Sequence, residues 1–164
     1  MTFASLMAAL SNIFSMPPFV IPIAIGGFET QVHFTQLPIF LSGILVGPWA
    51  GLLTGAVGGL YMSFVLPFIP FIVGGLALLG YFAGLFAKRM KLRPWLASIL
   101  AWCIQAPYVF VSDYLWFASF RQMSPTVALA TVSTILIKLT VEAVVASALA
   151  EVVVAFIKRS GFHI

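Results

Sequence analysis

Three ionisable side chains in this sequence stand inside long apolar stretches, where a charge is costly. They are Asp113, Lys138 and Glu142. Ionisable groups in such surroundings usually face a cavity or pair with one another. One lysine and two carboxylates can bind the polar groups of a small molecule, so this set indicates recognition of a polar or zwitterionic ligand.

Lys138 and Glu142 are four residues apart, which places them on one face of a helix. In one interpretation Lys138 binds an anionic or carbonyl group of a ligand, and Glu142 binds a donor. In the other they form an ion pair within the helix that satisfies itself. Lysine before glutamate is the weaker order for such a pair, which favours the ligand role for Lys138.

Asp113 is accompanied by Gln105 deeper on roughly the same side and by Trp116 one turn above. A carboxylate beside an aromatic ring can hold a ligand donor or a cation against that ring. Alternatively, Asp113 is an interfacial residue at a helix end, with Tyr114 and Trp116 in the aromatic belt of a membrane protein. The sequence leaves both interpretations open.

Glu29 and His33 lie in a polar segment, 26–33, and Gln36 begins the next apolar stretch. As parts of a lid these residues would contact a ligand, whereas as ordinary loop residues they would face water. A single histidine without further ligands does not make a metal site. We therefore predict neither a metal nor a cofactor.

The elements that must position these residues follow from the composition. Hydrophobic residues make up 62% of the 164 residues and charged residues 7%, and the mean hydropathy is +1.15. Twelve charged side chains cannot cover the surface of a soluble domain of this size, so we predict an all-α integral membrane protein with one domain, 1–164. The single Cys103 allows no internal disulfide. The basic residues flank apolar runs, which is typical of topology signals and not of nucleic-acid binding.

A membrane-spanning helix needs about 20 apolar residues, and division at proline, glycine and charge gives six candidates. The predicted spans are 2–25, 34–46, 49–65, 71–87, 95–117 and 125–157, and the first of them is broken by Met16-Pro17-Pro18.

Lysine and arginine predict the orientation of these spans. The segment 88–93 holds four basic residues and 158–159 holds two, all on the side that six spans assign to both termini. Only Arg121 falls on the other side. Because cytoplasmic segments carry the excess of basic residues, both termini are predicted to be cytoplasmic, in a multi-pass protein of a prokaryotic plasma membrane.

The depth of the intramembrane charges follows from the same frame. Asp113 is twenty residues after Arg93, and Lys138 is twenty residues before Lys158. At about 1.5 Å per residue both lie about 30 Å above the inner boundary, near the outer edge of the hydrocarbon. The polar segment 26–33 falls at the same end. This convergence predicts a pocket that opens to the outside.

Glycine recurs every four residues at positions 43, 47, 51, 55 and 59. Such spacing lets helix backbones approach closely in lipid, either within the chain or against a sliding partner, and we favour packing within the chain. Gly47-Pro48 also predicts the end of one helix and the start of the next. Ala4 and Ala8 form a weaker pair of small residues, which indicates a partner interface.

Two stretches, VHFTQLP at 32–38 and GILVGPWAG at 43–51, resemble the substrate-binding S components of energy-coupling factor (ECF) vitamin transporters. The Ala4-Ala8 pair is similar to the small-residue motif of that family's first helix. The resemblance implies a subunit that binds a vitamin-like micronutrient near the outer surface, under the loop that follows the first helix. It also implies two kinds of partner, a separate transmembrane coupling protein and two ATP-binding cassette (ABC) ATPases.

Riboflavin-type S components place an asparagine three residues before the lysine of the sixth helix. Here that position is Ile135, which counts against a flavin ligand. The chain has no phosphate-binding loop of its own and no hydrolase or metalloprotease motif, so we predict that it is not an enzyme. A self-sufficient secondary transporter or channel is the alternative function.

Overall fold

The computed structural model describes residues 2–25, 28–65 and 71–160, with the backbone alone at 23–25 and 28–30. Most of the described chain is helical. The elements, in chain order, are α1 (Thr2–Ile13), β1 (Ile21–Ile25), β2 (Phe28–Val32), α2 (Gln36–Leu45), α3 (Pro48–Gly58), α4 (Leu60–Val65), α5 (Ile72–Lys88), α6 (Pro94–Leu115), the π-helical segment η1 (Trp116–Phe120) and α7 (Pro125–Arg159).

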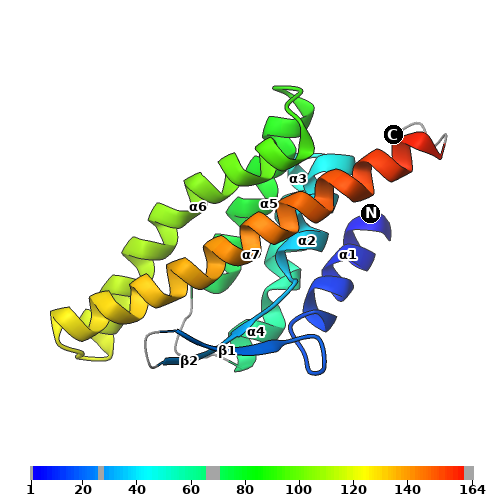
Figure 1. Cartoon of the computed structure of the whole chain (residues 1–164). Helices are drawn as coiled ribbons and strands as arrows, with labels where there is room; N and C mark the ends of the chain where they lie inside the picture. The colour runs from blue at the N-terminus through cyan, green and yellow to red at the C-terminus, as the bar shows by residue number, and fades with distance from the viewer. Residues whose placement is uncertain (1, 26–27, 66–70, 161–164) are drawn as a thin grey trace.

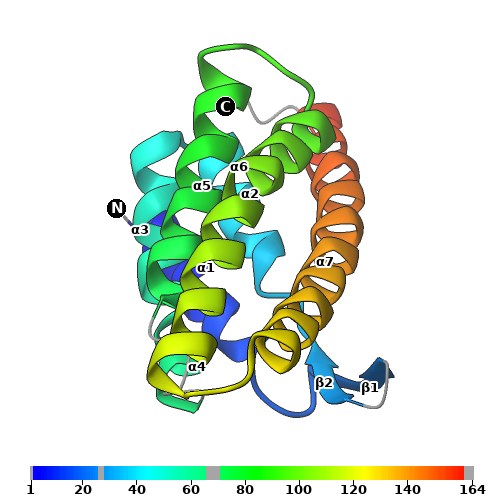
Figure 2. The same cartoon turned by 90° about the vertical axis from the view of Figure 1, so that its left-hand side faces the viewer.

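The molecule has two distinct ends (Figure 1, Figure 2). The β1–β2 hairpin, α4 and the turn that leads into α7 lie at one end. The turn between α5 and α6 and the last residues of α7 lie at the opposite end. The basic residues of 88–93 and 158–159 therefore lie at one end of the molecule, and Arg121 lies at the other.

Two helices in the described part of the chain are long and apolar enough to cross a membrane. They are Pro94–Phe120, which includes η1, and Pro125–Arg159. Each begins with proline, whose fixed φ and missing N–H suit the first turn of a helix. Ser124 caps α7, because its hydroxyl accepts a hydrogen bond from the Val127 N–H at 3.4 Å.

Four of the six predicted segments are helices with nearly the predicted bounds. The segments 34–46, 71–87, 95–117 and 125–157 correspond to α2, α5, α6 with the start of η1, and α7. These segments were bounded by proline, glycine and charge, which act locally on the backbone. The agreement concerns helices only, and a membrane crossing is a separate property.

The predicted break at Gly47-Pro48 is confirmed. α2 ends at Leu45 and α3 begins at Pro48. Gly47 has φ 138°, a conformation that glycine adopts readily and other residues rarely do. The chain thus reverses between two short helices at a residue with no side chain.

The predicted first span, 2–25, is wrong. α1 ends at Ile13, and residues 21–25 form strand β1. Pro17 and Pro18 lie between them, and proline lacks the N–H that a helix needs and disfavours helix in the residue before it. The chain therefore leaves the helix and turns back as an extended strand.

The polar segment 26–33 is also not a simple loop, since it contributes strand β2. The two strands pair antiparallel from Ile21 opposite Val32 to Ile25 opposite Phe28. The all-helical prediction therefore misses a two-stranded sheet. The predicted third span, 49–65, divides at Gly59 into α3 and α4.

Helix α5 packs so closely on α2 and α3 that only glycine fits the contact. A Cβ atom built at Gly51 would lie 2.1 Å from the Gly80 carbonyl oxygen, and one at Gly55 would lie 2.0 Å from that of Leu76. One at Gly43 would lie 2.6 Å from the Gly80 oxygen. These glycines pack within the chain, as predicted.

Helix α2 lies at the centre of the bundle, in contact with α1, α3, α5 and α7. All of its residues except Leu37 are buried. Ile39 and Phe40 pack with Leu79 of α5 in the main hydrophobic core. Because α2 begins inside the bundle, its first residue, Gln36, is also held in the interior.

Candidate ligand-binding cavity

A cavity with a volume of about 1120 Å³ lies between α2, α5, α6, α7 and the hairpin. Ligand cavities usually measure roughly 300–1000 Å³ and have mainly apolar walls with a few polar groups. Here too most of the wall surface is apolar, although half of the lining residues carry polar side chains. The polar side chains in the wall are Ser15, Gln31, His33, Thr35, Gln36, Tyr61, Gln105, Ser112, Asp113, Arg121, Thr131, Lys138 and Glu142.

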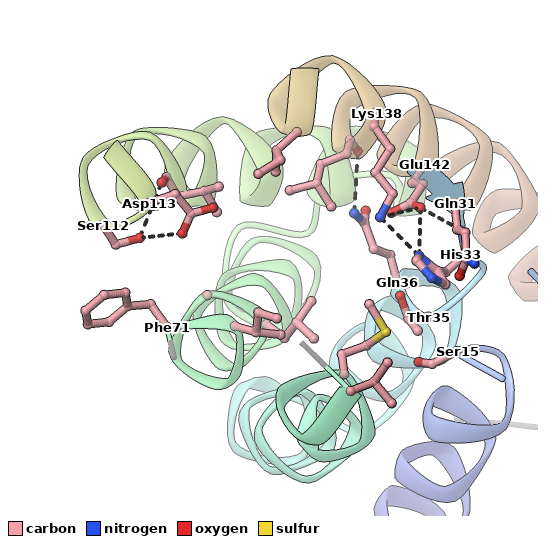
Figure 3. A pocket seen from close by; sticks show the side chains of 18 of the residues that line it. Ser15, Gln31, His33, Thr35, Gln36, Phe71, Ser112, Asp113, Lys138 and Glu142 are labelled. Carbon is pink, nitrogen blue, oxygen red and sulfur yellow. Dashed lines mark hydrogen bonds and ion pairs between the residues drawn. The ribbon is translucent and has the colours of Figure 1, made fainter. Parts of the chain in front are cut away.

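Glu142 lies at the centre of a buried polar cluster. Its Oε1 atom is 3.1 Å from Lys138 Nζ, one helical turn away. The same oxygen accepts a hydrogen bond of 2.6 Å from the backbone N–H of His33. Only 3% of Glu142 is exposed. We call His33, Lys138 and Glu142 the Glu142 cluster (Figure 3).

The third contact in the Glu142 cluster assigns the tautomer of His33. Lys138 Nζ lies 3.0 Å from His33 Nδ1, and an ammonium group has donors only. A charged Lys138 therefore donates to Nδ1, which corresponds to the tautomer of His33 with the ring proton on Nε2. The 3.4 Å approach of Nδ1 to Glu142 Oε1 is then a proximity without a hydrogen bond.

The cluster joins two elements that are far apart in the sequence. His33 follows strand β2, and Lys138 and Glu142 belong to α7. The hairpin end of the chain is thus tied to α7 by a charge-assisted hydrogen bond, which is stronger than a neutral one. Both earlier interpretations of Lys138 and Glu142 have a counterpart here, since the two residues pair with each other and also line the cavity.

Asp113 and Gln105 form the α6 side of the cavity. Asp113 is 4% exposed and Gln105 is 2% exposed. The Ser112 hydroxyl donates to Asp113 Oδ1 over a long 3.4 Å. Figure 3 places Asp113 and Ser112 across the cavity from the Glu142 cluster. Beside Gln105, a Cβ atom at Gly75 would lie 3.2 Å from Nε2, so glycine makes room for this amide.

Gln36 forms part of the opposite wall, beside the Glu142 cluster (Figure 3). Its side-chain amide nitrogen donates to the Leu139 carbonyl oxygen of α7 at 3.4 Å. Only 1% of the residue is exposed. Six of the eight predicted ligand residues therefore line one cavity, namely His33, Gln36, Gln105, Asp113, Lys138 and Glu142.

Trp116 and Glu29 are placed differently. Trp116 is half-buried and absent from the cavity wall, and its ring stacks on Phe120 and meets Phe71 edge-on. Phe71 itself lines the cavity, so Trp116 lies behind a wall residue. Glu29 belongs to strand β2, and its side chain lies outside the described residues.

Ala8 faces the inside of the bundle, and Ala4 is half-buried. Ala8 is 3% exposed. The Ala4 carbonyl oxygen accepts a hydrogen bond from Thr54 of α3, and that of Ala8 accepts one from Asn12. The methyl group of Ala8 is therefore covered by the chain itself, and a partner interface through this pair stays a prediction.

Sequence reasoning missed several residues of the cavity wall. Arg121 was expected at the outer headgroups alone, yet it lines the cavity. Thr131 also lines it, on the face of α7 that carries Ile135 and Lys138. The spacing of four and three residues along this helix was a usable signal, because such positions lie above one another.

A mainly helical chain with long apolar helices and a cavity of this size, whose mainly apolar wall carries buried polar side chains, is typical of ligand-binding membrane proteins. The comparison with protein families is more specific. Residues 1–157 match the family of ECF-type riboflavin transporter S components, and the chain belongs to this family. It is therefore a membrane-embedded substrate-binding subunit of a vitamin transporter, as the motifs in its first third indicated. No match was found among curated proteins.

Proposed function

We propose that this protein is the high-affinity binding subunit for uptake of a small, vitamin-like micronutrient, and that the cavity of about 1120 Å³ is its binding site. The observation that carries the proposal is the gathering of buried polar side chains from α2, α6 and α7 around that cavity. Polar groups buried in an apolar bundle are costly unless they are paired or functional.

The proposed ligand contacts are Lys138, Glu142, Asp113, Gln105, Gln36 and His33. Glu29 joins them if its strand closes over the ligand. Trp116 supports the site from behind Phe71, with which it is in edge-to-face contact. The hairpin acts as the lid, because Pro22 and Gln31 from its two strands line the cavity and His33 fastens it to α7.

For the orientation, we propose a multi-pass protein of a prokaryotic plasma membrane with six crossings and cytoplasmic termini. The excess of basic residues at 88–93 and 158–159 supports this orientation. The hairpin and Arg121 lie at the other end, which would face the outside. A ligand would then enter from outside and be covered by the hairpin.

For the partners, we propose a separate transmembrane coupling protein and two ABC ATPases, which would supply the energy for release inside. Ala4 and Ala8 of α1 are the proposed region of contact with the coupling protein. Glu151 has a different role, since its Oε2 accepts the Trp95 N–H at 3.1 Å and so caps the start of α6.

The test is mass spectrometry of small molecules released from protein purified in mild detergent. We expect a stoichiometric vitamin-like compound. Riboflavin is the first probe to titrate, because two observations about it disagree. The matched family is named for riboflavin, whereas Ile135 in the cavity wall argues against a flavin. Uptake by vesicles that contain this chain without any ATPase would contradict the proposal in favour of a secondary transporter.

A further inference from the structure

Two hydrogen-bond donors of the Glu142 cluster, Lys138 Nζ and the backbone N–H of His33, are already engaged. Lys138 Nζ contacts both Glu142 and His33 Nδ1, and the His33 N–H is bound to Glu142. One positive and one negative charge cancel within this cluster. An anionic ligand would have to break these contacts in order to reach Lys138.

Two buried acceptors in the wall, by contrast, lack a donor. Gln36 Oε1 and Gln105 Oε1 have no hydrogen-bond partner among the described residues. For Gln36 the assignment of oxygen and nitrogen is settled by its neighbour, since the Leu139 carbonyl requires the nitrogen. Solvent reaches neither oxygen in this arrangement. Both side chains line the cavity, and the terminal torsion of glutamine is broad, so rotation about it is the movement by which these oxygens would meet a ligand.

Asp113 is the third acceptor. Within the described chain its side chain accepts a hydrogen bond from the distant Ser112 hydroxyl, and no cation there forms an ion pair with it. Arg121 also lines the cavity but is exposed, at the end where the hairpin lies. A buried carboxylate with so little support favours a ligand that brings a donor or a positive charge.

The acceptors stand on two facing walls. Gln36 comes from α2, and Gln105 and Asp113 come from α6. The two α6 residues are eight positions apart, about 12 Å along the helix at 1.5 Å per residue. A single ligand that satisfies them must be elongated and must carry donors on more than one edge.

We infer, on the basis of the proposed function, that the ligand presents N–H or O–H donors to Gln36, Gln105 and Asp113. The portion buried between α2 and α6 is neutral or cationic, and it is neither a carboxylate nor a phosphate. These three residues determine specificity by accepting hydrogen bonds, while the Glu142 cluster holds the lid.

Matched probe pairs test this inference on the wild-type protein in detergent. The pairs are riboflavin with 3-methylriboflavin, pyridoxamine with 4-pyridoxate, and nicotinamide with nicotinate, and biotin and pantothenate are tested as anions. Binding is measured by calorimetry and by thermal shift. Within the pair that binds, the member that carries the hydrogen-bond donor should have at least a tenfold higher affinity.

The outcomes separate the inference from the proposed function. Tight binding of a carboxylate probe, or equal binding within a pair, overturns the inference and leaves the function standing. If no probe binds and no compound is released from the purified protein, the proposed function fails and the inference falls with it.

Variants then assign the contacts to residues. Gln105→Met and Asp113→Asn should each weaken binding of the preferred probe at least tenfold, with an unchanged elution profile in size-exclusion chromatography. Glu151→Gln is the matched control, because it removes a carboxylate outside the cavity and should leave the affinity unchanged. Unchanged affinity in both cavity variants overturns the assignment, and the probe pairs decide the case in which a variant does not fold.

Discussion

The contact between α3 and α5 and the cavity beside α6 represent opposite solutions to packing within one chain. At the contact, Gly51 and Gly80 let two backbones approach until no side chain fits between them. At the cavity, the helices surround a volume of about 1120 Å³, and long side chains such as Gln105 and Lys138 line it. The first region contributes stability through close packing. The second region is packed less closely and carries polar groups to which a ligand can bind.

The two sides of the cavity, on α7 and on α6, also differ from each other. The α7 side is internally satisfied through the Glu142 cluster, whereas the α6 side leaves Asp113 with one long hydrogen bond. Buried polar groups that are fully paired rigidify a structure, and those that lack partners are available to a ligand. The Glu142 cluster therefore contributes to stability as well as to the site, whereas Asp113 is available to a ligand, and mutations can test this difference.

The largest effect is expected from a side chain at the glycine contact. Gly51→Leu should abolish folding or lower stability by about 3 kcal/mol or more, because overpacking against backbone has no room to relax. Thermal unfolding in detergent measures this. Gly59→Ala is the control, since its Cβ atom would meet the flexible end of Leu76 at 3.0 Å and the Gly55 carbonyl oxygen at 3.2 Å, but no backbone atom closer than that. Equal stability of the two variants would show that the contact is looser than described.

The next effect concerns the charge of Glu142. Glu142→Gln should cost about 3 kcal/mol, because Lys138 is then a buried charge without its partner. The backbone N–H of His33 also loses a charged acceptor, so the hairpin should open. Chemical denaturation measures the stability, and protease cleavage within the hairpin measures the opening. A wild-type cleavage rate would contradict the role of Glu142 in holding the hairpin.

The double variant Lys138→Met with Glu142→Leu separates stability from function. Replacing a buried ion pair by apolar residues of similar size is often neutral or stabilising, so the melting temperature should recover relative to Glu142→Gln. Ligand affinity should still fall at least tenfold, about 1.4 kcal/mol. If both the melting temperature and the ligand affinity recovered, the Glu142 cluster would not belong to the binding site.

The smallest effect is expected at Ile135, which lines the cavity one turn before Lys138. Ile135→Asn introduces the asparagine found in riboflavin-type S components, and one added hydrogen bond is worth about 1 kcal/mol, roughly fivefold in affinity. Fluorescence quenching of riboflavin measures the change. Ile137→Asn on the exposed face of α7 is the control. If wild-type protein already binds riboflavin tightly and Ile135→Asn adds nothing, the argument against a flavin fails.

The sequence predicted those parts of the fold that depend on local chemistry. Gly47-Pro48 ended one helix and began another because glycine permits its φ and proline suits a first turn. The first predicted span failed because hydropathy counted 2–25 as one apolar run. The pair Pro17-Pro18, which stops a helix locally, was given too little weight against it.

The candidate site was predictable as a set of residues and a level in the membrane, but not as contacts. Ionisable residues in apolar stretches pointed to Asp113, Lys138 and Glu142 because burial of charge is rarely accidental. Helix periodicity does not say which face of α1 turns inward, and Ala8 proved to be covered by its own chain. The place of Arg121 in the cavity wall depended on how η1 and α7 pack, which is not a local property.

By itself the sequence determined that this is a membrane protein of the S-component family, with its helices bounded by proline and glycine, because composition and backbone chemistry are properties of each segment alone. Only the tertiary structure brought the backbone N–H of His33 to Glu142, 109 residues away, at 2.6 Å. It also left Gln36 and Gln105 with unpaired oxygens in one cavity. Such contacts depend on the packing of α2, α6 and α7 against one another, and no single segment encodes them.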